Sequence, residues 1–247
     1  FYYNNQEAAK YKLENARKEF VKDSIAKANK PVDTLAQKKD SAKADTQRVV
    51  ASSGTFRDAV KGEEQLVKAG NDLINITFST KGALVKMVEL KQFKGRDSNL
   101  LRLASTGFDR ISYPVVTGNN QTLQSADFYF NKIDSVKNAD GSSTYAFTLT
   151  SSDSASNASI THKYTIKPND YMIGFDIEMA GADRLLTQGN LNLSWQYAAV
   201  QQESDVSFEK QNTQVGFVED EEFDYFTIAN RSSVDFNKSV SWVGVRQ

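Results

Sequence analysis

The sequence contains no cysteine and only one histidine among its 247 residues. Without cysteine, the protein forms no disulfide bond and offers no thiolate ligand to a metal ion. A single histidine leaves no companion imidazole for a metal site. The formal net charge is −1, so no general electrostatic field draws the chain to nucleic acid or to anionic lipid.

Long apolar runs are missing as well. The longest are far shorter than the roughly 18 residues that a membrane-spanning helix requires. The glycines in STKGALV and NADGSS do not form a phosphate-binding loop, and no nucleophile elbow built on serine is present. A chain of this length can nevertheless bury roughly 70–75 % of its unfolded surface, so its core needs no covalent cross-links.

Charge and pattern divide the chain into two regions. Residues 1–49 hold 11 Lys and Arg against 7 Asp and Glu, whereas the remaining 198 hold 19 against 24. From Glu7 to Ala28, four-three-four spacing of apolar residues predicts an amphipathic helix, which Pro31 ends. The polar composition of residues 31–53 predicts a linker. The apolar positions of the helix are Ala9, Leu13, Ala16, Phe20, Val21, Ile25 and Ala28.

The two ends of the sequence suggest a piece of a longer chain. The first residues, FYYNNQ, are typical of the aromatic belt at the end of a transmembrane helix, although a frayed terminus is also compatible with them. The first residue is Phe1 rather than Met, and the alternating strand pattern of SVSWVGVRQ stops at Gln247. We therefore expect sequence to be missing at both ends, and we expect Trp242 to be buried in an interior strand.

From about Leu73 onward, short β-branched or aromatic segments alternate with turn residues. No helical pattern separates them, so the pattern predicts antiparallel strands. Pro168 and Asn169 mark the bend of a predicted hairpin in THKYTIKPNDYMIGFDIEM. At least nine or ten strands predict a large β-sandwich. The predicted strands are LINITFST, ALVKMVELKQF, DFYFNKI, TYAFTLT, SITHKYTIK, YMIGFDIEMA, NLNLSWQY and VSWVGV.

His162, in SITHKYTIK, is the one histidine that could act as a general acid or base. Sugar-ring-opening and acyl-transfer enzymes usually need such a positioned base. His162 alternates with its neighbours inside a predicted strand, so we interpret it as an ordinary strand residue rather than a catalytic base.

The densest charge lies in VEDEEFDYF. Clustered carboxylates can bind Ca²⁺, but consecutive spacing lacks the loop that would curl them around an ion. We interpret the run as a solvated loop or strand edge, where negative charge also prevents self-pairing. Trp195 and Trp242 could stack on sugars. In a β-sandwich, however, tryptophan side chains more often fill the core, and we expect this for both residues. The carboxylates are Glu219, Asp220, Glu221, Glu222 and Asp224.

Three segments resemble the large periplasmic domain of the YidC membrane protein insertase family. NDLINITFSTKGALVKMVEL resembles the start of that domain, with its strand, Thr80-Lys81-Gly82 turn and second strand. ITHKYTIKPNDYMIGFDIEM resembles its central hairpin, and VSWVGVRQ resembles its tryptophan-containing strand. The similarity extends from about residue 70 to residue 247, and the hairpin and the tryptophan strand are its most specific parts.

The resemblance implies an all-β fold with an N-terminal helix, namely a large antiparallel β-supersandwich of galactose mutarotase-like shape. It implies that residues 1–53 are the helix and polar linker after a transmembrane helix, and that residues 54–247 are the periplasmic domain, truncated at its C-terminal end. It also implies a bacterial inner-membrane protein whose domain assists the insertion and folding of membrane proteins, alone or with the Sec translocon.

The partners that the resemblance implies are nascent membrane proteins and the Sec translocon with SecD and SecF, without nucleic acid. The family's insertion machinery lies downstream of this region, so we expect no catalytic, cofactor-binding or metal-binding residue here. The alternatives are a mutarotase-like enzyme, which needs a histidine base and a carboxylate across a sugar cleft, and an exported glycan-binding module.

Overall fold

A computed structural model of the protein describes most of its compact unit Val49–Gln247. The expected helix over Glu7–Ala28 and nearly all of the expected linker lie outside the described residues. Among the described residues, no helix is long and apolar enough to cross a membrane. The described ranges are 53–103, 106–118, 121–153, 156–202, 204–230 and 233–246.

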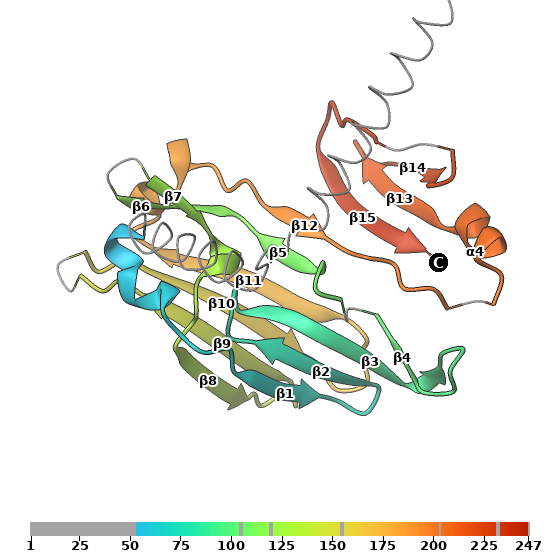
Figure 1. The fold of residues 1–247 in the computed structure, drawn as a ribbon, viewed down its shortest axis with the longest axis horizontal. Coiled ribbons are helices and arrows are strands. Elements are labelled where there is room, and N and C mark those ends of the chain that lie inside the picture. The colour runs from blue at the N-terminus through green and yellow to red at the C-terminus, as the bar shows by residue number, and fades with distance from the viewer. Residues whose placement is uncertain are drawn as a thin grey trace, which may run out of the picture. The chain divides into compact units, whose positions relative to one another are not determined.

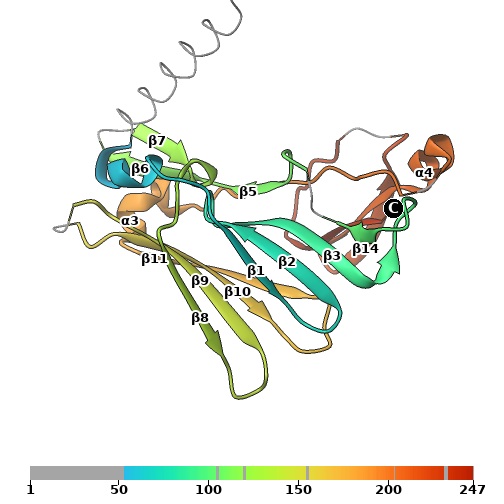
Figure 2. The same cartoon turned by 60° about the horizontal axis from the view of Figure 1, so that its bottom comes forward.

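Two four-stranded antiparallel sheets form the body of this unit (Figures 1 and 2). The first has the order β1-β2-β3-β4 and the second the order β11-β10-β9-β8. The strands are β1 (Leu66–Gly70), β2 (Ile74–Ser79), β3 (Leu84–Lys94), β4 (Leu100–Arg102), β8 (Lys132–Lys137), β9 (Ser143–Thr150), β10 (Ser159–Ile166) and β11 (Ile173–Ala180).

The core lies where these two sheets face each other. The Phe78 ring on β2 lies 4.7 Å from the Tyr164 ring on β10 and 5.4 Å from the Phe147 ring on β9, measured between ring centroids. Every second side chain of β10 is buried, because successive strand residues point to opposite faces. Each such large apolar side chain contributes roughly 1.5–3 kcal/mol on burial. The sandwich predicted from alternation is confirmed.

The hairpin predicted over residues 161–179 is also confirmed. β10 and β11 pair in register from Ser159↔Ala180 to Ile166↔Ile173. Asn169 lies in the connecting turn with φ 51°, a left-handed conformation that asparagine tolerates better than most residues.

The segment DFYFNKI differs from its prediction as a single strand. Phe128 and Phe130 are buried, which accounts for the alternation. The backbone amides of Tyr129 and Phe130, however, donate to the carbonyls of Ala59 and Thr80, on two different segments. Only Lys132 and later residues of this segment join β8. A buried loop therefore produced the same alternating pattern as a strand.

Shorter elements complete the unit. The turn η1 (Gly54–Val60) places Phe56 against the ring of Phe128, 5.5 Å away between centroids. Two small sheets have the orders β12-β5 and β6-β7. The elements are β5 (Arg110–Ser112), β6 (Pro114–Gly118), β7 (Gln121–Gln124), η2 (Ser125–Asp127), α3 (Ala182–Leu185), η3 (Thr187–Gly189) and β12 (Ser194–Gln196).

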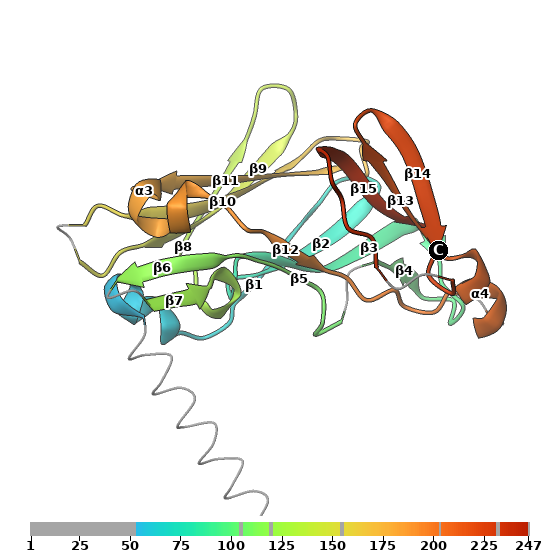
Figure 3. The same ribbon diagram turned by 90° about the horizontal axis from the view of Figure 1, so that it is seen from above.

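The last part of the chain forms a three-stranded sheet of order β14-β13-β15 (Figure 3). The Asp205 carboxylate caps the helix before it by accepting the backbone N–H groups of Ser207 and Phe208. Such a cap satisfies amides that have no partner inside the helix. The elements are α4 (Val206–Asn212), β13 (Gln214–Glu219), β14 (Glu222–Thr227) and β15 (Val240–Arg246).

β15 confirms the strand predicted at Val240–Val245, but the expected burial of both tryptophans is wrong. Trp242 is 52 % exposed and Trp195 is 60 % exposed. Trp242 lies on the face of its sheet opposite to buried Phe217. Trp195 lies on a strand of only three residues.

Candidate functional site

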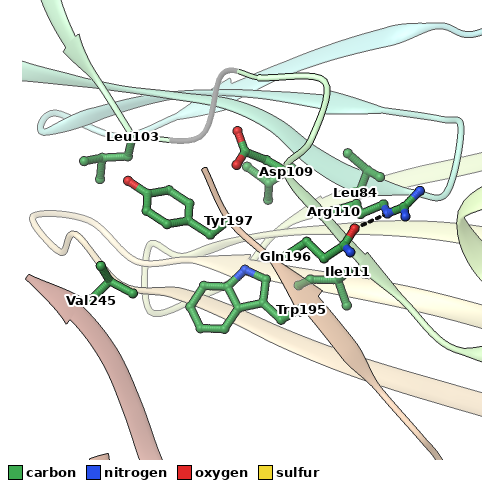
Figure 4. A pocket seen from close by; sticks show the side chains of 10 residues that line it. Leu84, Leu103, Asp109, Arg110, Ile111, Trp195, Gln196, Tyr197 and Val245 are labelled. Carbon is green, nitrogen blue, oxygen red and sulfur yellow. Dashed lines mark hydrogen bonds between the residues drawn. The ribbon is translucent and has the colours of Figure 1, made fainter. Parts of the chain in front are cut away.

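An apolar cleft of about 350 Å³ lies among β3, β5, β12 and β15 (Figure 4). Its aromatic groups are Trp195 and Tyr197, and Val245 of β15 contributes to the lining. The other described residues that line it are Leu84, Val85, Leu103, Asp109, Arg110, Ile111 and Gln196.

The pairing of β5 with β12 positions the middle of the cleft. Trp195 lies directly opposite Ile111, and Gln196 lies opposite Arg110. Directly opposed residues point to the same face of an antiparallel pair, so Trp195 and Ile111 share one face. On the other face, the Arg110 Nε donates a hydrogen bond to the Gln196 Oε1 (Figure 4). The side chains of Arg110 and Gln196 therefore join the two strands, and all four residues line the cleft.

Asp109 joins the loop before β5 to the chain after β12. Its Oδ2 accepts hydrogen bonds from the Thr106 backbone N–H at 2.7 Å and the Thr106 hydroxyl at 2.8 Å. Its Oδ1 accepts the Ala198 backbone N–H at 2.6 Å. The carboxylate is buried, and charged acceptors in such bonds are stronger than neutral ones. Asp109 thus holds the wall that carries Tyr197.

Burial dominates the electrostatics of the cleft. Desolvation, and then the negative charge of Asp109, raise the pKa of Tyr197 above its usual value. The described lining contains no serine, histidine or lysine. Such a surface fits apolar or aromatic side chains, and Asp109 is the one carboxylate among the described lining residues.

His162 lies in the sandwich core and not in the cleft. It is 1 % exposed, and its Nδ1 lies 3.0 Å from the carbonyl oxygen of Ala83. Because a carbonyl only accepts, Nδ1 donates, and Nε2 accepts the Tyr113 hydroxyl at 2.7 Å. Burial lowers the pKa of His162 to about 4. His162 lies inside β10, as its interpretation as a strand residue predicts.

The acidic run occupies a hairpin at the edge of the last sheet, as the interpretation as a solvated loop or strand edge predicts. Asp220 and Glu221 form the turn between β13 and β14. Glu219 Oε1 accepts the backbone amides of Asn237 and Lys238, both at 2.7 Å. Among the described residues, no group of three or more ligating side chains could hold a metal ion.

One residue that the sequence suggested as a binding residue lies in the cleft, together with several that the sequence did not suggest. Trp195 lines it, whereas Trp242, His162 and the acidic run do not. Tyr197 could have been found, because it lies two residues after Trp195 and alternation places both on one side. Leu103, Asp109 and Ile111 carry no such signal, since only the tertiary fold brings their segments to β12.

The family model of the YidC periplasmic domain matches residues 66–247. Several proteins named membrane protein insertase YidC are similar to the chain, among them relatives from three organisms. The identity is 26 % over 218 residues in Parabacteroides distasonis and 26 % over 238 residues in Phocaeicola vulgatus, covering 87 % and 94 % of the chain. It is 31 % over 191 residues in Bacteroides fragilis, covering 76 % of the chain.

The chain spans only about a third of the length of these relatives, namely 33 %, 37 % and 29 %. The matched residues include both sheets of the sandwich, the cleft and the last sheet. The resemblance noted in the strand segments is therefore confirmed over residues 66–247. The chain belongs to the YidC periplasmic domain family, and this region lies on the periplasmic side of the bacterial inner membrane.

Proposed function

We propose that this chain is a non-catalytic periplasmic domain of a membrane protein insertase. It assists the insertion and folding of inner-membrane proteins, alone or with the Sec translocon and its partners SecD and SecF. The observation that carries the proposal is the apolar cleft, whose described lining is mostly aromatic and aliphatic. Family membership supports the same role.

In this proposal the cleft holds apolar side chains of a nascent membrane protein for a short time. Trp195 and Tyr197 provide flat, partly exposed rings, and Asp109 keeps their wall in place. An exposed apolar surface on a folded protein commonly marks a binding site. The proposal assigns the periplasmic domain to residues 54–247.

Site-specific photocross-linking tests the proposal. A photoreactive residue replaces Tyr197 in the membrane-bound insertase, and a ribosome-stalled nascent membrane protein is the probe. We expect adducts with the stalled chain from position 197 and none from position 136. The control, Val136, is 59 % exposed on β8 and does not line the cleft. Insertion of the stalled chain without any adduct at position 197 contradicts the proposal.

A further inference from the structure

A network of buried hydrogen bonds connects two strands that line the cleft. The Nδ1 of His162 donates to the carbonyl oxygen of Ala83 at 3.0 Å, and its Nε2 accepts the hydroxyl of Tyr113 at 2.7 Å. The hydroxyl of Tyr164 donates to the same carbonyl oxygen at 2.8 Å. None of the four residues is more than 1 % exposed. We call Ala83, Tyr113, His162 and Tyr164 the buried network.

Both ends of the buried network continue directly into the cleft. Ala83 immediately precedes β3, and the first residue of that strand, Leu84, lines the cleft. Tyr113 immediately follows β5, and the middle residue of that strand, Ile111, also lines the cleft (Figure 4). The imidazole of His162 therefore joins the start of one cleft strand to the end of another.

The carbonyl that His162 binds belongs to a residue in a left-handed conformation. The φ angle of Ala83 is 45°, which is unfavourable for a residue with a Cβ atom. Its carbonyl oxygen accepts hydrogen bonds from both His162 and Tyr164, so both of its lone pairs are used. Two side chains of β10 thus stabilise the turn from which β3 starts.

Backbone hydrogen bonds also hold the same two segments to their neighbours. The N–H of Tyr113 donates to the Ser125 hydroxyl at 3.2 Å, and the N–H of Gly82 donates to the Phe128 carbonyl at 2.7 Å. These bonds attach each segment to η2 or to the residue after it. The buried network adds a connection between the two segments, and we expect its removal to loosen the cleft without unfolding the sandwich.

Apolar side chains enclose the imidazole of His162. Among the described residues, Tyr113 is the titratable group that bonds to it, Tyr164 shares its acceptor, and no charged side chain bonds to it or packs on its ring. Burial lowers the pKa of His162 to about 4 and raises the pKa values of both tyrosines. The buried network is therefore neutral at pH 7. The apolar neighbours are Phe130, Phe147, Phe175 and Ile177.

We propose that His162 is a positioning residue of the cleft, which in its neutral form holds Leu84 and Ile111 where an apolar ligand contacts both. Because it concerns the same cleft, this role of His162 rests on the proposed function. Protonation turns Nε2 into a donor, so the Tyr113 hydroxyl loses its acceptor. The cleft should therefore bind apolar ligands at neutral pH and release them on acidification.

Removal of one hydroxyl group tests the proposal at neutral pH. The full 247-residue chain carries Trp242→Phe, which leaves Trp195 as the only tryptophan. The probe is N-phenyl-1-naphthylamine, a neutral apolar dye whose binding is followed by energy transfer from Trp195. We expect Tyr113→Phe to weaken dye binding about fivefold, which corresponds to roughly 1 kcal/mol.

Thr117→Val is the matched control for the loss of a buried hydroxyl. Thr117 is 1 % exposed, and its hydroxyl donates to the Gln121 carbonyl at 3.1 Å within the β6–β7 hairpin. Thr117 does not line the cleft. This variant should therefore lose stability to a similar extent as Tyr113→Phe and keep its dye affinity.

Substitutions of His162 separate positioning from packing. With histidine present, dye affinity should fall about twofold at pH 4, because half of the imidazoles are then protonated and the competent fraction is halved. Glutamine offers one donor and one acceptor without titrating, so His162→Gln should retain dye binding at both pH values. His162→Leu has no polar group and should weaken binding at both. Near-UV circular dichroism verifies the fold of each variant at each pH.

The outcomes distinguish a failure of this role from a failure of the proposed function. Equal dye affinity in Tyr113→Phe and Thr117→Val, or the same acid profile in His162→Gln as in the parent, would overturn the role of His162 and leave the proposed function standing. An acid-sensitive dye site without nascent-chain adducts at position 197 would do the reverse. Absence of energy transfer in the parent would contradict both, because the cleft would then take no apolar ligand.

Discussion

The hydroxyl of Tyr113 donates a hydrogen bond to Nε2 of His162 over 2.7 Å inside the sandwich core. Protonation of His162 would turn Nε2 into a donor and break this arrangement. Burial already lowers the pKa of His162 from 6.5 to about 4. The unfolded chain therefore binds more protons than the folded chain between these two pH values.

The folded state should consequently lose stability as pH falls from about 6.5 towards 4. The contribution of His162 is fully present above pH 6.5, and its loss amounts to about 3 kcal/mol, at roughly 1.4 kcal/mol per pH unit. Urea unfolding across this range measures it. Carboxylates also titrate there, so the comparison is with His162→Gln, which should be less stable at neutral pH but show a flatter profile. Parallel profiles would contradict the assignment.

Replacing Glu221 by glycine should stabilise the last sheet. Asp220 and Glu221 form the β13–β14 turn with φ values of 53° and 68°. A left-handed conformation costs a non-glycine residue roughly 1–2 kcal/mol, partly offset by the entropy of glycine. We expect a gain of about 0.5–1 kcal/mol, measured by thermal unfolding. Glu222→Gly, in the adjacent extended strand, should be destabilising. A loss at both positions would contradict the turn geometry.

Gly244→Ala should displace the Trp242 ring. The added Cβ would lie 2.5 Å from that ring, and overpacking of this kind costs roughly 1–3 kcal/mol. Fluorescence of the Trp195→Phe background reports the environment of Trp242, and acrylamide quenching should increase. Gly107→Ala is the matched control, because nothing lies within 4 Å of its added Cβ. An unchanged Trp242 signal would show that the ring does not lie over Gly244.

Asp109→Ala should destabilise the protein and open the cleft. The substitution removes the acceptor of the Thr106 and Ala198 amides, and an unpaired buried donor costs roughly 1–3 kcal/mol. Urea unfolding gives the stability, and the fluorescence of Trp195 in a Trp242→Phe background gives the local change. Asp183→Ala, at an exposed position, should have little effect. A similar loss in both variants would argue against a special role for Asp109.

The domain should not accelerate the interconversion of galactose or glucose anomers. A mutarotase-like mechanism needs a histidine base, and His162 is the only histidine in the sequence and is enclosed in the core. Polarimetry measures the rate with and without protein. An acceleration that His162→Ala abolishes would contradict the proposed function.

Local sequence patterns were sufficient to predict the regular strands of the fold. Alternation over β10 and β11, with Pro168 and Asn169 between them, predicted a hairpin, and the structure confirms that the two strands pair. The same alternation misled at Phe128 and Phe130, because burial of every second residue does not require one neighbouring strand. The helix Glu7–Ala28 stays a prediction.

The sequence by itself determined the class of the fold, the interpretation of His162 as an ordinary strand residue, and the family. The fold class and the interpretation of His162 follow from strand periodicity and from the residue types present, which are local properties. The family follows from the resemblance of three segments to a known domain. Only the tertiary structure decided where Trp195 and Trp242 lie. Their strands look as apolar as core strands, but burial depends on what packs against each face. That depends on contacts between residues distant in sequence, which also bring Ile111, Trp195 and Val245 to one cleft.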